Sequence, residues 1–207
     1  MAAPQVEFFF DCSSPWTYLA FTRIEDVCAR HGAELIWRPI LVGGVFNEVN
    51  KGVYAERAAP VPAKARYYQK DLGDWARLHG ITIGKPSIFP VRAVRAQRAC
   101  LYARRAGRLP QFARAVFHAY WGEDRDISSA PVLQELGEAA GLPAQGLAEA
   151  LDADVFKQEL RRETDELIAR GGFGSPTMFL NRTDMYFGND RLPLLDAALA
   201  RLKAKPA

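Results

Sequence analysis

Residues 8–20 read F-F-F-D-C-S-S-P-W-T-Y-L-A, and this stretch decides the fold. The aromatic run at its start extends back to Val6 and is short and apolar, which is typical of a buried strand. Ser14 and Pro15 then favour the start of a helix, because serine is a common N-cap and proline suits the first helical position. The stretch therefore predicts a buried strand that passes directly into a helix.

The residues that follow extend this pair of elements into a β-α-β unit. The predicted helix runs to about His31, and Gly32 is a suitable stop for it. Residues 35–40 form a second apolar run, which Pro39 ends or places near a sheet edge. We therefore expect two strands of one sheet in this part of the chain.

Helical patterns dominate the middle of the chain, from about residue 47 to residue 169. Apolar residues recur there at steps of three and four, with glycine or proline between the segments. Two short strand patterns, separated by a polar turn, come only near the end, and an amphipathic helix follows them. The predicted helices are 67–80, 91–107, 109–122, 130–141, 144–169 and 192–202, and the late strands are 177–180 and 185–187.

The 207 residues have the composition of an ordinary soluble globular protein, with 49% hydrophobic and 25% charged side chains. The 27 basic and 24 acidic residues are mixed along the chain and give a net charge of +3, so nucleic-acid binding is not suggested. No apolar run approaches the roughly 20 residues that span a bilayer, and the N-terminus is a poor secretion signal. We expect a cytoplasmic protein without a membrane partner.

The three cysteines, Cys12, Cys28 and Cys100, are too few and too scattered for a disulfide framework. No two of them have C-x-x-C spacing, and Cys12 is expected to be a packed residue at the strand end. Cys28 and His31 are one helical turn apart, but no second pair of ligands accompanies them. The sequence therefore predicts a reducing compartment and no metal site.

Two features of this order resemble the active site of thioredoxin-like proteins. Ser14-Pro15-Trp16-Thr17 stands at the strand-to-helix turn, where redox members carry C-x-x-C, and Gly174-Ser175-Pro176-Thr177 stands where such proteins place a cis-proline facing that turn. The whole chain resembles the kappa-class glutathione transferases and, more closely, the bacterial 2-hydroxychromene-2-carboxylate isomerases. The motifs that carry this resemblance are F-F-F-D-x-S-S-P-W-T-Y-L-A at 8–20, R-P-I-L-V-G-G-V-F at 38–46, K-x-x-Y-x-x-x-D-L-x-x-W-A at 64–76, V-F-H-A-Y-W-G-E at 116–123, G-F-G-S-P-T-M-F at 172–179 and F-G-N-D-R-L at 187–192.

The resemblance implies an α/β protein with a thioredoxin-like fold and a large all-helical insertion, as in DsbA-like proteins. Residues 1–46 and 170–207 would form the thioredoxin-like, glutathione-binding domain, and residues 47–169 the helical insertion domain. The resemblance also implies a homodimer, for which the sequence itself shows no interface.

A serine at the start of a helix can stabilise a thiolate. Free backbone N–H groups and the positive end of the helix dipole favour an anion there. A hydrogen bond from the Ser14 hydroxyl to a thiolate contributes about 1.5–3 kcal/mol, enough to lower a thiol pKa of about 8.5 by about 1–2 units. The resemblance implies that Ser14 is catalytic and that the thiol belongs to bound glutathione. The alternative is that Ser14 is only a helix cap.

The resemblance also assigns residues that would hold glutathione as a cofactor. A cis-Pro176 would leave the backbone of Ser175 extended and unpaired, so that it can hydrogen-bond the tripeptide as an added strand does. Asp190 would receive the γ-glutamyl ammonium and Lys64 the glycyl carboxylate. Alternatively, Pro176 is a simple turn proline, and residues 189–190 are a helix cap. The candidates for glutathione binding are Asn50, Lys64, Ser175, Pro176, Asn189 and Asp190.

The function implied by the resemblance is glutathione-dependent isomerisation of 2-hydroxychromene-2-carboxylate, an aromatic carboxylate from hydrocarbon degradation. The glutathione thiolate adds to a conjugated carbon, the ring opens, a former double bond rotates and the thiolate leaves, so that one difficult step becomes two. Lys51, Lys64 or Arg92 would receive the substrate carboxylate. Tyr67 and Trp121 either line an aromatic pocket or pack between helices. A kappa-class transferase that conjugates electrophiles and a non-catalytic DsbA-like binding protein stay as alternatives.

Overall fold

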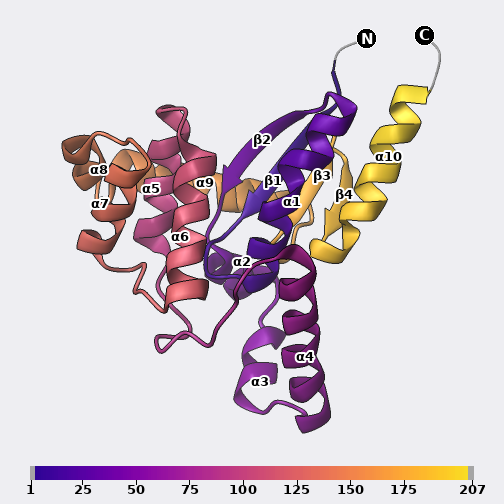
Figure 1. Cartoon of the computed structure of the whole chain (residues 1–207), viewed down its shortest axis with the longest axis horizontal. Coiled ribbons are helices and arrows are strands. Elements are labelled where there is room, and N and C mark those ends of the chain that lie inside the picture. The colour runs from indigo at the N-terminus through magenta and orange to yellow at the C-terminus, as the bar shows by residue number, and fades with distance from the viewer. Residues whose placement is uncertain (1–2, 205–207) are drawn as a thin grey trace.

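A four-stranded mixed sheet organises the fold. The computed structural model describes residues 3–204 (Figure 1). β1 pairs parallel with β2 and antiparallel with β3, and β3 pairs antiparallel with β4, so that the order is β2-β1-β3-β4. The strands are β1 (Gln5–Phe10), β2 (Glu34–Pro39), β3 (Thr177–Leu180) and β4 (Asp184–Phe187). The prediction that the two ends of the chain form one sheet is confirmed, and β2, which ends at Pro39, is an edge strand.

Helices connect and cover the sheet. α1 follows β1 directly, and between β2 and β3 the described elements are all helical. No helix within residues 3–204 is long and apolar enough to cross a membrane. The helices are α1 (Pro15–His31), α2 (Val42–Val49), α3 (Gly52–Ala58), α4 (Pro62–His79), α5 (Val94–Arg105), α6 (Leu109–Glu123), α7 (Ala130–Ala139), α8 (Ala144–Ala150), α9 (Asp154–Ala169), the 3-10 helix η1 (Asn189–Arg191) and α10 (Leu192–Ala204).

The structure corrects the sequence-based predictions in the helical region. The single helix predicted over 144–169 is two helices, α8 and α9, separated by a turn at residues 151–153. Ala150 of α8 and Phe156 of α9 pack into the same cluster with Leu101 of α5. The short helices α2 and α3 were not predicted, although α2 has apolar residues at helical spacing, at Val42, Val45, Phe46 and Val49. α4 begins at Pro62, earlier than predicted, with this proline in its first turn.

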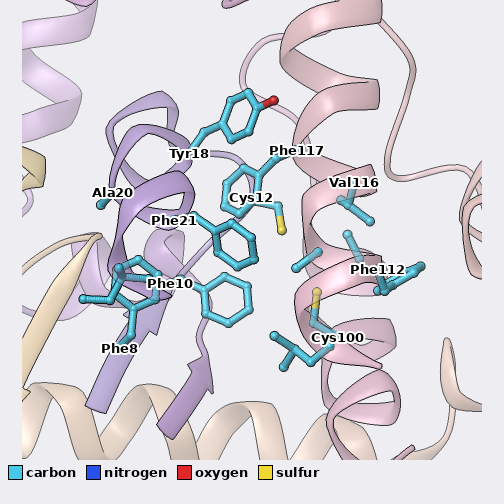
Figure 2. Close-up of a cluster of buried hydrophobic side chains, with 14 of the residues drawn as sticks. Phe8, Phe10, Cys12, Tyr18, Ala20, Phe21, Cys100, Phe112, Val116 and Phe117 are labelled. Atoms are coloured by element: carbon cyan, nitrogen blue, oxygen red, sulfur yellow. The ribbon is translucent and has the colours of Figure 1, made fainter. Parts of the chain in front are cut away.

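Alternate side chains of β1 point to opposite faces of the sheet, and each face has its own apolar cluster. Phe8 and Phe10 pack against Phe21 of α1, and Phe10 also contacts Phe117 of α6 (Figure 2). Phe9 faces the other way, into a cluster with residues of α2, α9 and β3. The sheet and the helical region thus share a core, and the division into domains at residues 46 and 170 stays a prediction.

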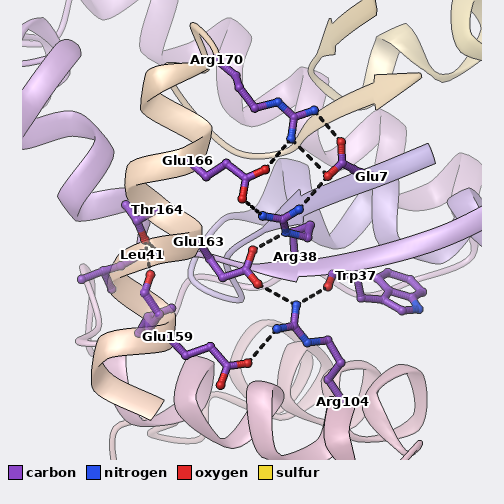
Figure 3. A network of polar contacts seen from close by, with 11 residues as sticks. Glu7, Trp37, Arg38, Leu41, Arg104, Glu159, Glu163, Thr164, Glu166 and Arg170 are labelled. Atoms are coloured by element: carbon purple, nitrogen blue, oxygen red, sulfur yellow. Dashed lines mark hydrogen bonds and ion pairs between the residues drawn. The ribbon is translucent and has the colours of Figure 1, made fainter. Parts of the chain in front are cut away.

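A network of ion pairs attaches α9 to the sheet (Figure 3). Arg38 of β2 contacts Glu163 and Glu166 of α9. The carboxylate of Glu7 on β1 is 2% exposed and accepts hydrogen bonds from Arg38, at 2.6 Å, and from Arg170. Burial opposes the charge of Arg38, but the two glutamates of α9 raise its pKa above the usual value. The network therefore holds β1, β2 and α9 in a fixed arrangement.

Candidate functional site

The candidate site is centred on the turn between β1 and α1. Ser14 is the N-cap of α1, and its Oγ accepts a hydrogen bond from the backbone N–H of Thr17 at 3.2 Å. Pro15 follows at the start of the helix and has no N–H to satisfy. The Ser14 hydroxyl donates to the backbone carbonyl of Ser175, 3.2 Å away. The N-terminus of α1 therefore meets the loop before β3 at this hydroxyl.

The loop before β3 contains a cis peptide bond between Ser175 and Pro176, which confirms the predicted cis-proline. The side chain of Ser175 is buried and fixes the loop: its Oγ accepts from the Asp11 N–H at 3.0 Å and shares a hydrogen bond of 2.8 Å with Thr17 Oγ1. The Ser175 carbonyl is not unpaired, because it accepts from Ser14. A carbonyl oxygen can accept a second hydrogen bond, so this backbone is still able to take a further donor.

The side chain of Asp11 holds the turn in place through hydrogen bonds. The sequence analysis did not identify Asp11 as a site residue. Its side chain is fully buried and accepts from the Ser13 N–H, the Ser13 hydroxyl and the Val42 N–H, each at 2.8 Å. Burial raises the pKa of Asp11 above the usual value, although these donors oppose the rise. The turn is thus attached to the first residue of α2.

The segment 188–191 lies beside the cis-proline. The Gly188 N–H donates to the Pro176 carbonyl at 3.0 Å, and η1 packs against α1. Asn189 is 5% exposed, and its Nδ2 has no hydrogen-bond partner among the described residues. Asp190 is exposed and pairs with the adjacent Arg191. Because an unpaired buried donor is costly, Asn189 is suited to receive an acceptor from a ligand.

Asn50 and Lys64, the two remaining glutathione-binding candidates, differ in their relation to this loop. Asn50 caps the end of α2, and its Nδ2 donates to the carbonyl of Phe173 at 3.2 Å, close in sequence to Ser175. Lys64 is exposed in the first turn of α4 and makes no hydrogen bond or ion pair with another residue in the range 3–204. The structure therefore brings Asn50 to the loop that holds Ser175, and it leaves Lys64 on a separate helix.

Aromatic side chains surround the turn. Trp121 is 4% exposed, and its Nε1 donates to the carbonyl of Cys12 at 3.0 Å, so it packs behind the turn. Tyr67 is exposed, and its neighbour Tyr68 makes the contact instead: the Tyr68 hydroxyl accepts from Trp16 Nε1 at 2.9 Å. The sequence did not single out Tyr68, because nothing in the helical pattern tells which of two adjacent tyrosines faces α1.

No cluster of three or more potential metal ligands occurs in the part of the chain that the structure describes. The three cysteines are free and buried, and Cys12 packs at the end of β1, as the sequence predicts. Burial raises the pKa of Cys12 well above the usual value for a thiol. The turn therefore offers a hydroxyl and backbone donors, and its one cysteine is a poor nucleophile.

Comparisons with known proteins agree with this geometry. A family model described as a DsbA-like thioredoxin domain matches residues 5–200. A 2-hydroxychromene-2-carboxylate isomerase from Pseudomonas putida is 31% identical over 95% of this chain and 95% of its own length. Glutathione S-transferase kappa 1 of Rattus norvegicus is 28% identical over 93% of this chain and 90% of its own. A solved structure of 2-hydroxychromene-2-carboxylate isomerase has a TM-score of 0.81 at 27% identity and covers 96% of this chain and 95% of that one. The chain belongs to the DsbA-like thioredoxin family, in the group that contains the 2-hydroxychromene-2-carboxylate isomerases and the kappa-class glutathione transferases.

Proposed function

We propose that the chain is a glutathione-dependent isomerase of 2-hydroxychromene-2-carboxylate that serves the degradation of aromatic compounds as a cytoplasmic homodimer. The observation that carries this proposal is the placement of the Ser14 hydroxyl at the start of α1 and against the cis-proline loop. The near full-length relatives that are named isomerases support the type of reaction.

The residues around the turn fit glutathione. Asn189 presents a buried amide donor without a partner, and the Ser175 carbonyl can accept a second hydrogen bond. Asn50, Lys64, Ser175, Pro176, Asn189 and Asp190 would hold the tripeptide. Bound glutathione supplies a thiol whose anion is the nucleophile of the isomerisation.

Ser14 would act on the sulfur through its hydroxyl proton. Ser14 Oγ accepts a hydrogen bond from the Thr17 N–H, and its own hydroxyl donates a hydrogen bond to the Ser175 carbonyl in this structure. Rotation about one side-chain bond can redirect that proton to a thiolate. The dipole of α1 adds a favourable potential for the same anion. Together these interactions would lower the thiol pKa by about 1–2 units, so that the thiolate dominates near neutral pH.

The ends of glutathione would be held by charge. Asp190 would receive the γ-glutamyl ammonium beside its present partner Arg191, and its exposure leaves room for this second cation. Lys64 would pair with the glycyl carboxylate, and because its side chain has no acidic partner among the described residues, no ion pair has to be broken.

A kappa-class glutathione transferase is the alternative function, which the kappa-class relatives support. The two functions are separated by measuring isomerisation of 2-hydroxychromene-2-carboxylate, with and without glutathione, beside conjugation of chloro-dinitrobenzene. Glutathione-dependent isomerisation would support the isomerase, and conjugation alone would support the transferase. If neither reaction occurs and millimolar glutathione leaves the melting temperature unchanged, the chain is a binding protein of another kind.

A further inference from the structure

Arg57, at the end of α3, lies against two aromatic rings. Its Cζ is 5.5 Å from the centroid of the Phe46 ring and 5.6 Å from that of the Phe89 ring. Phe46 belongs to α2, and Phe89 belongs to the loop between α4 and α5. The guanidinium therefore lies where three separate segments of the helical region approach one another.

The ion pairs of the other stacked arginines show what is unusual about Arg57. Within residues 3–204, each other arginine that lies over an aromatic ring also pairs with a glutamate, and Arg57 pairs with no acidic residue there. The others are Arg38, Arg105, Arg114 and Arg170. A guanidinium held by aromatic rings alone keeps its N–H donors available for an external anion, and its planar fork matches a carboxylate.

A chain of contacts connects Arg57 with the turn at Ser14. The Phe89 ring packs at 6.3 Å from that of Trp121, whose indole N–H donates to the carbonyl of Cys12. On the other side Tyr68 accepts from Trp16, the second residue of α1. Burial raises the pKa of Tyr68, and the nearby charge of Arg57 opposes that rise. In Figure 1, α3 and α4 project together from the region of α2.

The rings beside Arg57 suit an aromatic ligand. Phe89 is 53% exposed, so it presents apolar surface that a flat ring of a substrate can cover. The three cations that the sequence suggests for the substrate carboxylate lack this setting, because none of them lies over an aromatic ring in the described part of the chain. These are Lys51, Lys64 and Arg92.

We propose that Arg57 binds the carboxylate of the aromatic substrate while Phe46 and Phe89 contact its ring, an inference that rests on the proposed isomerase function. The guanidinium donates two parallel hydrogen bonds to the carboxylate, while its stacking on the Phe46 and Phe89 rings orients it for this contact. Arg57 thereby selects aromatic substrates that carry a carboxylate, and glutathione binds without it.

The first experiment measures initial rates for Arg57→Gln, Arg57→Lys and the control Arg66→Gln. Arg66 is an exposed cation of α4 and, two residues from Tyr68, points away from the turn. We expect Arg57→Gln to raise the KM for 2-hydroxychromene-2-carboxylate roughly 10- to 100-fold, as the loss of a charged hydrogen-bonded contact implies. The KM for glutathione should stay unchanged, Arg57→Lys should be intermediate, and Arg66→Gln should match the parent protein.

A binding experiment tests Arg57 even if the proposed isomerisation does not occur. Calorimetry compares chromone-2-carboxylate with chromone, its uncharged analogue, on the parent protein and on Arg57→Gln. The inference predicts that the parent protein prefers the carboxylate and that the variant, with an unchanged melting temperature, loses the preference. If the parent protein catalyses no isomerisation, but it prefers the carboxylate and Arg57→Gln does not, the isomerase proposal fails and the carboxylate site stands. An equal preference in both proteins, or an unchanged substrate KM in Arg57→Gln, would overturn the role of Arg57.

Discussion

The hydroxyl of Ser14 donates a hydrogen bond to the backbone carbonyl of Ser175, 161 positions further along the chain. Ser14 ends the first strand-helix turn, and Ser175 begins the cis-proline loop. The site therefore exists only when the two terminal parts of the chain have assembled into one sheet. The same hydroxyl is the group that we propose to stabilise a bound thiolate. One hydroxyl would therefore serve both the folded structure and the bound glutathione.

The hydroxyl of Thr17 is predicted to hold the cis-proline loop in place. It is fully buried and shares a hydrogen bond with Ser175 Oγ. Thr17→Val keeps the shape of the side chain but removes this bond, so the buried Ser175 hydroxyl loses one of its partners. We expect a loss of about 1–3 kcal/mol in the free energy of unfolding, measured by urea denaturation, and weaker glutathione binding. Thr17→Ser, which keeps the hydroxyl, should retain most of both. Equal unfolding midpoints for Thr17→Val and the parent protein would show that this bond does not fix the loop.

Asn189 is predicted to matter for glutathione more than for folding. Its Nδ2 is buried and has no hydrogen-bond partner within residues 3–204, so Asn189→Ala removes an unsatisfied donor from the free protein and should leave the melting temperature nearly unchanged. In the complex the lost hydrogen bond should raise the Kd for glutathione roughly 2- to 10-fold, measured by calorimetry. Gln111→Ala, at an exposed amide on α6, is the control. A Kd equal to that of the control would remove Asn189 from the binding site.

Glu7 is predicted to be the most sensitive member of the ion network that joins β1, β2 and α9. Its 2% exposed carboxylate lies between Arg38 and Arg170, so Glu7→Gln removes the most buried anion of the network and leaves both guanidinium groups with only their partners on α9. We expect a loss of about 3–5 kcal/mol in the free energy of unfolding. Asp74→Asn is the matched control, because Asp74 pairs with Lys70 and Arg77 on the exposed surface of α4, where the loss of an ion pair should hardly change the stability. Similar losses in the two variants would contradict the buried role of Glu7.

Acid should destabilise the fold through carboxylates that are paired in the native state. Hydrogen bonds from His31 and Arg30 lower the pKa of Asp196, and Arg38 and Arg170 lower that of Glu166 although burial opposes them. A carboxyl group whose native pKa is depressed stabilises the fold above its unfolded pKa of about 4, and this stabilisation is lost as the pH falls through the native pKa. Urea denaturation should therefore show a steep decrease in stability below about pH 4. Asp196→Asn should flatten this decrease, and an identical pH profile would exclude Asp196 as a contributor.

Local patterns explain which parts of the structure the sequence could predict. The buried strand β1 and the N-cap Ser14 each depend on a few adjacent residues, and short sequence patterns identify them. The cis-Pro176 was predicted from the resemblance to thioredoxin-like proteins, because no local pattern distinguishes a cis-proline from an ordinary turn proline. The position of Arg57 depends on contacts among α2, α3 and the loop before α5, and a local sequence pattern does not show how separate segments pack against one another. The bond between Thr17 and Ser175 joins two motifs that the sequence identified separately, but no one-dimensional pattern shows that two side chains will meet.

The pKa of the glutathione thiol in the complex tests the central claim most directly. It is measured from the ultraviolet absorbance of the thiolate over a pH titration, with saturation checked by calorimetry for both the parent protein and Ser14→Ala. We predict a thiol pKa about 1–2 units below the free value of about 8.5 in the parent protein. In Ser14→Ala, which should still fold and bind glutathione, the thiol pKa should be higher and nearer the free value, because only the dipole of α1 remains. The same thiol pKa in both saturated complexes would contradict the claim that the Ser14 hydroxyl stabilises the thiolate.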